Sequence, residues 1–242
     1  MTELYYLVFP ERERASLLTE LLPVVGTGDK PYNRHTSLRA LQSVIGHLLA
    51  RSLIAKRLHL PLGSISLYRT HYGKPECTAA PCIHFTISHS EHTVLCVLSD
   101  KPAGADVEYI RPLPYKAIAQ RFFTNHECRI LSSVPAERQL AFFYRLWAVK
   151  ESYTKMLGTA LFPAVRSCEV PLNDIQEPYR DAEQRQNGVI PFTRLPSVHS
   201  YYVQGYLDGS TVYAVCTQDA GMLSVNRLSF QYWFEELSLQ RG

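Results

Sequence analysis

The sequence predicts an α+β fold built from two similar halves. Each half contains one long segment with helical periodicity, residues 36–58 in the first and 137–157 in the second. Short apolar runs typical of strands accompany each helix, and they do not alternate strictly with helices as they would in a doubly wound sheet. A division near residue 103 gives an N-terminal α+β subdomain, 1–103, and a C-terminal α+β subdomain, 104–242.

The first half is expected to hold a strand, a long helix and a series of short strands. Residues 4–9 are an apolar run that ends at Pro10, which favours a strand. Residues 36–58 carry leucine and isoleucine at helical spacing, and the pattern stops before Pro61. Further short apolar runs predict strands at 65–68, 83–87, 94–98 and 105–110.

The second half becomes helical after Pro114. Thr124 and Glu127 have the spacing of a capping box, in which each side chain binds the other residue's amide. The long helix over 137–157 is followed by Gly158, an expected C′ glycine.

The last third of the chain is predicted to be a loop followed by a hairpin. Residues 171–198 are polar and rich in proline, so we expect a loop there. Two apolar runs, 201–207 and 211–217, flank Asp208-Gly209-Ser210 and predict a β-hairpin.

Composition indicates a folded protein and excludes several classes. Of the 242 residues, 46% are hydrophobic and 19% are charged, which excludes a disordered chain. The net charge of +3 favours anionic ligands only mildly, so nucleic acid is not expected as a partner. The first residues lack the pattern of a secretory signal, and no apolar run approaches the ~18 residues that span a membrane.

The six cysteines do not form a metal-binding or redox motif. None is spaced as C-x-x-C, and no histidine pair completes a zinc pattern. Cys96 and Cys216 lie in apolar runs, where cysteine acts as a small hydrophobic residue. We therefore expect reduced thiols and a cytoplasmic protein.

Two carboxylates are predicted on one face of a strand. In Gly104-Ala105-Asp106-Val107-Glu108, Asp106 and Glu108 are two residues apart, so a strand would point both to the same side. A hard cation such as Mg²⁺ would relieve their repulsion. The alternative is a solvated strand edge with acidic side chains.

A second polar pattern lies on the long helix of the second half. Trp147, Glu151 and Lys155 are four residues apart and so share one helix face. They could form only a surface Glu–Lys pair. Alternatively, Glu151 could join Asp106 and Glu108 as the third carboxylate of a magnesium site, with Lys155 one turn away to meet a phosphate.

A third pattern is Ser88-His89 at the end of an apolar strand. A nucleophile–base pair is not expected, because neighbouring strand residues face opposite sides and no G-x-S-x-G motif surrounds the serine. The two side chains could hold a phosphate, or they could make only local hydrogen bonds.

Five motifs occur in order over residues 36–160. They are Gly73-Lys74-Pro75, Phe85-Thr86-Ile87-Ser88-His89-Ser90, Gly104-Ala105-Asp106-Val107-Glu108, Arg121-Phe122-Phe123 followed by Glu127, and Trp147-x-x-Lys150-Glu151-x-x-x-Lys155. Together they resemble the Sfp-type 4′-phosphopantetheinyl transferases, which activate carrier proteins.

The resemblance implies both a fold and a reaction. The fold would be two α+β halves related by a pseudo-twofold, with coenzyme A between them, in a monomer that resembles a dimer. The enzyme would transfer the phosphopantetheine arm of coenzyme A to a serine of an apo acyl or peptidyl carrier protein. Adenosine 3′,5′-bisphosphate would be released.

Motif positions imply roles for residues of the second half. Asp106, Glu108 and Glu151 would bind Mg²⁺, which Mn²⁺ could replace, at the pyrophosphate of coenzyme A. Lys155 would meet the same phosphates and stabilise the leaving group. Glu151, directly or through a metal-bound water, would accept the proton of the carrier serine, with Glu127 as the second candidate.

Motif positions in the first half imply contacts to the nucleotide of coenzyme A. Lys74 and Pro75 would border the adenine, and Ser88 and His89 would hold the 3′-phosphate. Glu91 stands where the family often has glycine, and its charge must point away from that phosphate or meet a cation.

The basic residues of the first half depart from the family pattern. The family has an arginine early in its first long helix, and the corresponding residue here is Gln42. Arg39 or Arg34 is expected to replace that arginine, and Lys30 is a further candidate phosphate contact.

Two other functions compete with the transferase. Three carboxylates alone would suit a magnesium-dependent phosphohydrolase or nuclease, but this leaves the Gly73-Lys74-Pro75 and Ser88-His89 motifs without a role. A carrier-binding module without catalysis would not need the metal set and Lys155. Fatty-acid, polyketide and peptide-synthetase carriers all stay open, and the family's broad-acting branch favours the last two, which serve secondary metabolism.

Overall fold

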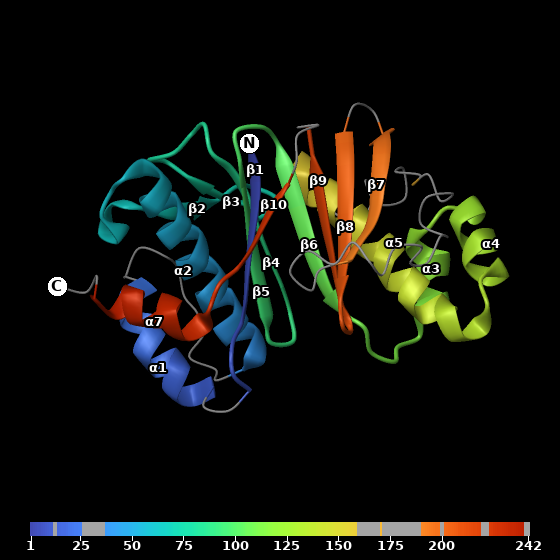
Figure 1. The fold of residues 1–242 in the computed structure, drawn as a ribbon, viewed down its shortest axis with the longest axis horizontal. Coiled ribbons are helices and arrows are strands. Elements are labelled where there is room, and N and C mark those ends of the chain that lie inside the picture. Colours follow the sequence, from blue (N-terminus) through green and yellow to red (C-terminus); the bar gives the residue numbers. More distant parts are fainter. Residues whose placement is uncertain are drawn as a thin grey trace. The chain divides into compact units, whose positions relative to one another are not determined.

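A computed structural model describes residues 1–11, 14–25, 37–158, 170, 190–198, 201–218 and 223–239. The chain forms two compact units (Figure 1). The first comprises residues 1–101 and 223–242, and the second comprises residues 102–222. Both units mix helices with an essentially antiparallel sheet, so the predicted α+β class is confirmed.

The first unit is built on a four-stranded sheet with the strand order β10-β1-β5-β4. Strand β1 pairs parallel with β10 and antiparallel with β5, and β4 is an edge strand. A short hairpin, β2-β3, forms a separate two-stranded sheet. The elements are β1 (Thr2–Val8), α1 (Arg14–Val25), α2 (Leu38–Leu58), the 3₁₀ turn η1 (Leu62–Ser64), β2 (Leu67–Arg69), β3 (Pro75–Cys77), β4 (His84–Ser90), β5 (Thr93–Ser99), β10 (Ser224–Arg227) and α7 (Phe230–Leu239).

Helix α2 forms the centre of the first unit's core. Ser37 caps its N-terminus by accepting a hydrogen bond from the Ala40 amide, and His59 ends it in the left-handed conformation. Leucine, isoleucine and valine side chains of α2 pack against β4 and β5 and meet apolar residues of α1 and α7. Because the helix is buried along most of its length, its few polar side chains must find partners within the unit.

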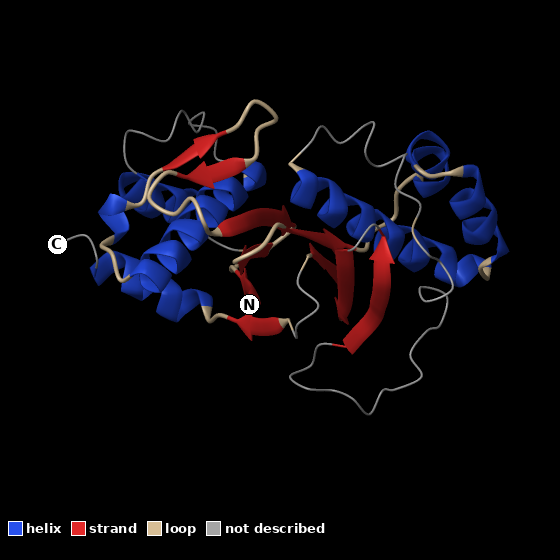
Figure 2. Cartoon of the chain, turned by 90° about the horizontal axis from the view of Figure 1, so that it is seen from above, coloured by secondary structure: helices blue, strands red, loops and turns tan. Residues whose placement is uncertain are grey.

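The second unit contains a four-stranded antiparallel sheet with the order β6-β9-β8-β7. Helix α5 packs directly against β6 and β9, as Figure 2 shows for one face of this sheet. The shorter helices α3 and α4 contact each other and α5. The elements are β6 (Ala103–Tyr109), α3 (Tyr115–Phe122), α4 (Asn125–Ser133), α5 (Ala136–Leu157), β7 (Ile190–Val198), β8 (Tyr201–Asp208) and β9 (Thr211–Thr217).

Local signals in the second unit correspond to the predicted helix ends. Thr124 and Glu127 form the capping box at the start of α4, with both reciprocal hydrogen bonds present. Gly158 ends α5 with φ of 65°, a conformation that favours glycine. The predicted hairpin at Asp208-Gly209-Ser210 is strand β8, the turn and strand β9.

Two predictions from the sequence differ from the structure. Residues 190–198 were expected to be loop, but they form β7, which pairs with β8. Residues 171–189 of the same expected loop lie outside the described residues. The sequence assigned 223–242 to the second half, whereas β10 pairs with β1, so this segment belongs to the first unit.

Two negative findings apply to the described part of the chain. None of its helices is long and apolar enough to cross a membrane. Its five cysteines are free thiols, namely Cys77, Cys82, Cys96, Cys128 and Cys216.

Candidate active site

The predicted carboxylate pair lies on strand β6. Asp106 and Glu108 are two residues apart on this regular strand, which pairs with β9 from Ala103 to Tyr109, so both point to the same face. The Asp106 side chain is almost fully buried, with 4% exposed. A buried carboxylate needs a compensating charge, which excludes the solvated strand edge as a description of this residue.

Lys155 of α5 supplies that charge. Its Nζ lies 2.6 Å from Asp106 Oδ1, and the Lys155 side chain is 29% exposed. The surface Glu–Lys interpretation had expected Lys155 to pair with Glu151 along the helix. The ion pair instead joins the helix to strand β6, because α5 packs directly on this strand.

Glu108 is held by the tryptophan of the same helix. Trp147 Nε1 donates a hydrogen bond of 3.1 Å to Glu108 Oε1. The Trp147 ring stacks on Phe143 with centroids 6.0 Å apart and meets Phe122 edge-on at 5.3 Å. The aromatic contacts fix the indole, so its N–H is pre-oriented toward the carboxylate.

The three carboxylates interact electrostatically. Burial raises the pKa of Glu108 to about 8, with Asp106 and Glu151 adding to the rise. Burial also raises the pKa of Glu151 to about 7, and the nearby Asp106 charge adds to it. Lys155 opposes both shifts. A full set of negative charges is therefore unfavourable here unless a cation joins them.

The same charges act on Lys155 in the opposite direction. Burial disfavours its positive charge, but the attraction of Asp106, Glu151 and Glu108 outweighs burial and raises the pKa of Lys155 above its usual value. The ammonium is thus retained at neutral pH, where it can neutralise an anion.

The donor set suits a divalent cation by its chemistry. In the present side-chain arrangement, no group of three His, Cys, Asp or Glu residues in the described ranges is gathered to hold a metal ion. Asp106 is instead engaged by Lys155, and Glu108 by Trp147. Burial, and after it the charge of Asp106, raises the pKa values of Glu108 and Glu151, and a hard divalent cation would offset both effects.

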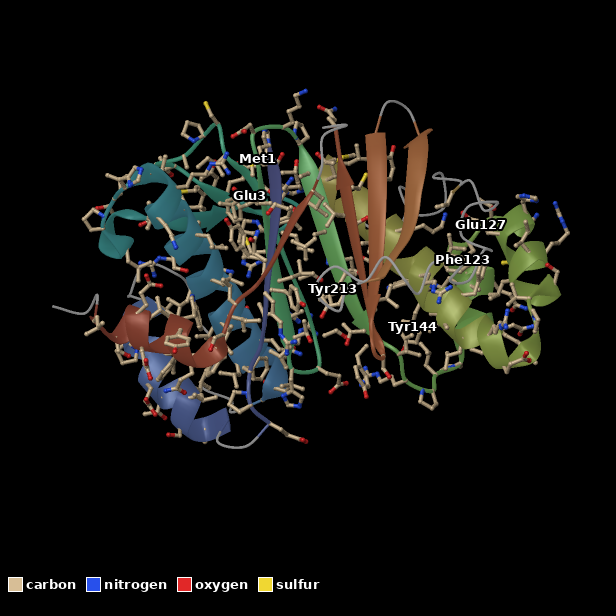
Figure 3. The ribbon with its side chains drawn as sticks, in the orientation of Figure 1. Met1, Glu3, Phe123, Glu127, Tyr144 and Tyr213 are labelled. Carbon is tan, nitrogen blue, oxygen red and sulfur yellow. The ribbon has the colours of Figure 1, made fainter. Side chains whose placement is uncertain are left out.

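Glu127 is in a different environment from these carboxylates. Its side chain and that of Lys150 are both 0% exposed, and they form an ion pair of 2.8 Å. Glu127 Oε1 also accepts from the Val170 amide at 3.0 Å, and Oε2 accepts from the Thr124 amide at 2.8 Å. Lys150 Nζ lies 5.8 Å from the ring centroid of Phe123, and Figure 3 labels Phe123 and Glu127.

These contacts give Glu127 a clear structural task. One carboxylate joins the start of α4, the middle of α5 and the backbone at Val170. Sequence reasoning did not anticipate Lys150 as its partner. One feature of the sequence could have indicated this partner. Lys150 follows Leu146, which is buried, by one helical turn, so the lysine lies on the side of α5 that faces the core.

The first unit carries the remaining predicted residues. Lys74 and Pro75 lie at the end of the β2-β3 turn, and both are partly buried. Burial lowers the pKa of Lys74, and the neighbouring Glu76 partly offsets this effect. Lys74 is thus a cation in a restricted environment, which suits contact with an anionic ligand.

Ser88 and His89 lie on β4 and face opposite sides of the strand. They immediately precede the turn to β5, in which Ser90 pairs with Thr93. Both side chains could reach a single phosphate only near this end of the strand. The geometry of the turn is therefore part of any such site.

The candidate basic residues give a mixed result. Lys30 and Arg34 lie outside the described residues. Arg39 is exposed on the first turn of α2. Gln42, at the position of the family's arginine, is 6% exposed, and its amide donates to the Glu91 carbonyl at 2.7 Å.

Two family profiles match consecutive parts of the chain. The profile of the 4′-phosphopantetheinyl transferase superfamily matches residues 102–216. A second profile, 4′-phosphopantetheinyl transferase, N-terminal, matches residues 33–101. The boundary between the matches coincides with the boundary between the two units at residues 101 and 102.

Individual relatives have the same family name. The chain is 32% identical over 197 residues to 4′-phosphopantetheinyl transferase Sfp of Bacillus subtilis, covering 78% of this chain and 82% of Sfp. It is 36% identical to psf-1 of Bacillus pumilus over 56% of this chain and 58% of that protein. It is 33% identical to the human L-aminoadipate-semialdehyde dehydrogenase-phosphopantetheinyl transferase over 59% of this chain and 52% of that protein.

The extent of these matches differs among the relatives. For psf-1 and the human protein the chain spans only somewhat more than half of the relative's length. The match to Sfp extends across both units. Together, the two profiles and this relative show that the chain belongs to the 4′-phosphopantetheinyl transferase superfamily, as an Sfp-type member.

Proposed function

We propose that this protein transfers the 4′-phosphopantetheine arm of coenzyme A to a serine of an apo carrier protein. The observation that carries the proposal is the cluster of Asp106, Glu108, Glu151 and Lys155 on β6 and α5. It combines carboxylates that favour a divalent cation with a lysine that stays charged. Transfer of a phosphoryl group depends mainly on positioning and charge neutralisation, which these groups can supply.

The three carboxylates would hold Mg²⁺, or Mn²⁺ in its place. When bound, the metal supplies positive charge to the pyrophosphate of coenzyme A. The raised pKa values of Glu108 and Glu151 support this assignment, since burial and then neighbouring negative charge raise them, and a divalent cation would offset both effects.

The reaction forms one bond and breaks one. The serine oxygen of the carrier bonds to the phosphorus that bears the pantetheine, and the bridging P–O bond of the pyrophosphate breaks. Adenosine 3′,5′-bisphosphate leaves with the electron pair of that bond. The serine proton must go to a base, and we assign this role to Glu151, whose charge interacts with those of Asp106 and Lys155 in the candidate site.

Glu127 was the second candidate for this base. Both of its oxygens accept hydrogen bonds and its side chain is fully buried, so these contacts favour a structural role for it. Lys155 would neutralise the charge that develops on the leaving phosphate. Its partial exposure and raised pKa support this assignment.

The nucleotide of coenzyme A would be bound by residues of the first unit. Lys74 and Pro75 would border the adenine, and Ser88 and His89 would contact the 3′-phosphate. Arg39 is the one of the three further basic candidates that lies within the described residues, on an exposed helix face. The pseudo-twofold relation between two similar halves stays a prediction.

We propose polyketide or peptide-synthetase carriers as protein substrates, because the broad-acting branch of the family that the motifs resemble often serves secondary metabolism. A monomeric state and a cytoplasmic location are further proposals. The free thiols of the described cysteines support the second of these.

Product analysis separates transfer from hydrolysis. Coenzyme A and Mg²⁺ are incubated with the protein, with and without an apo carrier, and the nucleotides are separated by chromatography. The proposal predicts adenosine 3′,5′-bisphosphate only when the apo carrier is present, and none after chelation of the metal. Equal nucleotide release without a carrier would identify a phosphohydrolase instead.

A further inference from the structure

The turn between β4 and β5 contains a strained residue. Glu91 has φ of 47°, a left-handed conformation that a non-glycine residue rarely adopts. Apart from His59, which ends α2, it is the one non-glycine residue with positive φ among those described. Strain of this kind persists only where surrounding contacts impose it, and it is often found beside functional sites.

Two other elements impose this turn geometry. The Gln42 amide of α2 donates to the Glu91 carbonyl at 2.7 Å. The Phe9 amide, just after β1, donates to the His92 carbonyl at 3.0 Å, and the Phe9 and His92 rings meet at 5.2 Å. Both turn residues are thus held from outside the hairpin.

A second turn of the first unit is held from the same helix. Arg69 Nη1 donates to the Gly73 carbonyl at 2.9 Å, and Arg69 Nη2 lies 3.2 Å from His47 Nε2. Because a guanidinium only donates, His47 must accept at this nitrogen and is therefore uncharged. Burial, with help from the nearby arginines, lowers the pKa of His47 to about 4, which agrees with a neutral ring.

The two held turns carry the two nucleotide-binding motifs assigned above. Glu91 follows Ser88 and His89 at the end of β4, and Gly73 immediately precedes Lys74. Both anchors, Gln42 and His47, are buried polar residues of α2, with 6% and 8% of their surface exposed. A buried polar side chain is expected to have a specific hydrogen-bond partner. Here Gln42 binds one turn directly, and His47 contacts Arg69, which binds the other turn.

We propose that Gln42, and His47 acting through Arg69, are positioning residues that hold the two coenzyme A-binding turns of the first unit in their binding conformation. This inference rests on the proposed function. It assigns to α2 a role in substrate affinity that does not require Gln42 to touch the ligand.

The test compares the Michaelis constant for coenzyme A with kcat in Gln42→Met and Arg69→Met. Each variant removes the hydrogen bonds to one turn. We expect KM for coenzyme A to rise about three- to tenfold, the effect of losing one hydrogen bond. We expect kcat to change by less than about twofold, because the proposed chemical groups lie on β6 and α5 and are untouched.

Matched controls come from the same helix. Ser52 Oγ accepts from Trp233 Nε1 of α7 at 3.1 Å, so Ser52→Ala removes a partly buried hydrogen bond of α2 that involves neither turn. Arg57 pairs with Glu3 and Asp100 at 2.8 and 2.7 Å, so Arg57→Met removes an arginine network away from both turns. Both controls are expected to lower Tm without changing KM for coenzyme A.

Conservative variants distinguish positioning from general damage. His47→Gln keeps an acceptor for Arg69 and should retain a KM close to wild type, whereas His47→Leu should raise it. In a Glu91→Gly background the left-handed turn is no longer strained, so Gln42→Met should raise KM less than it does in the wild type. If Gln42→Met does not fold, the shorter Gln42→Asn, which does not reach the carbonyl, should show the same rise.

The outcomes separate this inference from the proposed function. If the wild-type protein transfers the arm but the turn variants raise KM no more than Ser52→Ala and Arg57→Met do, only the positioning role is overturned. Wild-type protein that neither binds nor consumes coenzyme A would overturn both. A selective rise in KM with rescue by His47→Gln would establish the positioning role.

Discussion

Gly104 of β6 lies against the backbone of Ser152 on α5 so closely that a side chain at position 104 would overlap the Ser152 carbonyl oxygen. The obstacle is backbone and not the end of a flexible side chain, so it cannot move aside cheaply. This close approach brings β6 and α5 near enough for Lys155 to reach Asp106 at 2.6 Å. A glycine without catalytic chemistry thus sets the spacing of the candidate site.

Gly104→Ala is therefore expected to destabilise the protein and reduce activity together. Overpacking at a rigid contact costs about 1–3 kcal/mol of unfolding free energy or more. Gly63→Ala is the matched control, because a Cβ there would meet no atom within 4 Å. Urea unfolding of both variants checks the prediction, and a Gly104→Ala protein as stable as Gly63→Ala would refute the close packing.

Lys155→Met should lower kcat about 100-fold while changing the affinity for coenzyme A less, because leaving-group charge is greatest in the transition state. The exposed Lys116 of α3 provides the control variant Lys116→Met, which should keep full activity. Steady-state kinetics with coenzyme A as the varied substrate checks both. Wild-type kcat in Lys155→Met would leave this lysine with only a structural ion pair.

The same variant tests the metal assignment by a readout other than activity. Without Lys155, Asp106 loses its partner, so Mg²⁺ should raise Tm more in Lys155→Met than in the wild type. Thermal unfolding with and without Mg²⁺ measures this difference. An Mg²⁺ effect that is absent from both proteins would contradict a cation site at these carboxylates.

The buried Glu127–Lys150 pair yields a prediction about structure and not about catalysis. Glu127→Gln alone should destabilise the protein by about 3 kcal/mol or more, because it leaves the Lys150 charge uncompensated in the core. Adding Lys150→Met should recover much of this loss and restore most of kcat. If kcat is lost equally in the single and double variants while stability recovers, Glu127 would be a chemical group after all.

Acidification should destabilise the protein through His47. Its pKa is lowered from 6.5 to about 4 in the folded state by burial first and then by Arg69 and Arg51. The unfolded chain therefore binds the proton more readily, so stability is full above pH ~6.5 and is lost as pH falls from there toward 4. At pH 5 the loss should be about 2 kcal/mol.

Urea unfolding at neutral pH and at pH 5 measures this loss. His47→Gln has no ring to protonate, so its stability should fall less over the same interval. Contributions from other groups, such as His84, are common to both proteins and cancel in the comparison. Identical pH dependence in the two proteins would show that His47 is not the responsible group.

The elements with strong local signals were predictable from sequence. Helices α2 and α5 are long and periodic, and their ends carry a left-handed residue or glycine. Strand β7 was missed because Pro191 and Pro196 make its sequence typical of a loop, and its pairing with β8 determines its structure instead. The four-residue β10 gives almost no local signal, and its partner β1 lies at the other end of the chain.

The sequence predicted the shared face of two candidate site residues but not the side-chain contacts that they make. The spacing of Asp106 and Glu108 on a strand predicts their shared face correctly. The Lys155–Asp106 pair was not predictable, because it depends on how closely Gly104 lets the strand approach the helix. Helical spacing alone would pair Lys155 with Glu151, whereas the ion pair in the structure joins Lys155 to Asp106. The contact of Gln42 with Glu91 joins residues 49 positions apart, so it also depends on tertiary packing.

The transfer reaction itself is tested by the intact mass of apo carrier proteins after incubation with coenzyme A and Mg²⁺. Acyl, polyketide and peptidyl carriers are each treated with the wild-type protein and with Asp106→Ala, which removes the carboxylate paired with Lys155. We predict that at least one carrier gains the mass of a single phosphopantetheine group with the wild type. We expect a labelling rate about 100-fold lower with Asp106→Ala. Carriers that keep their apo mass with the wild-type protein, or equal labelling by Asp106→Ala, would contradict the proposal.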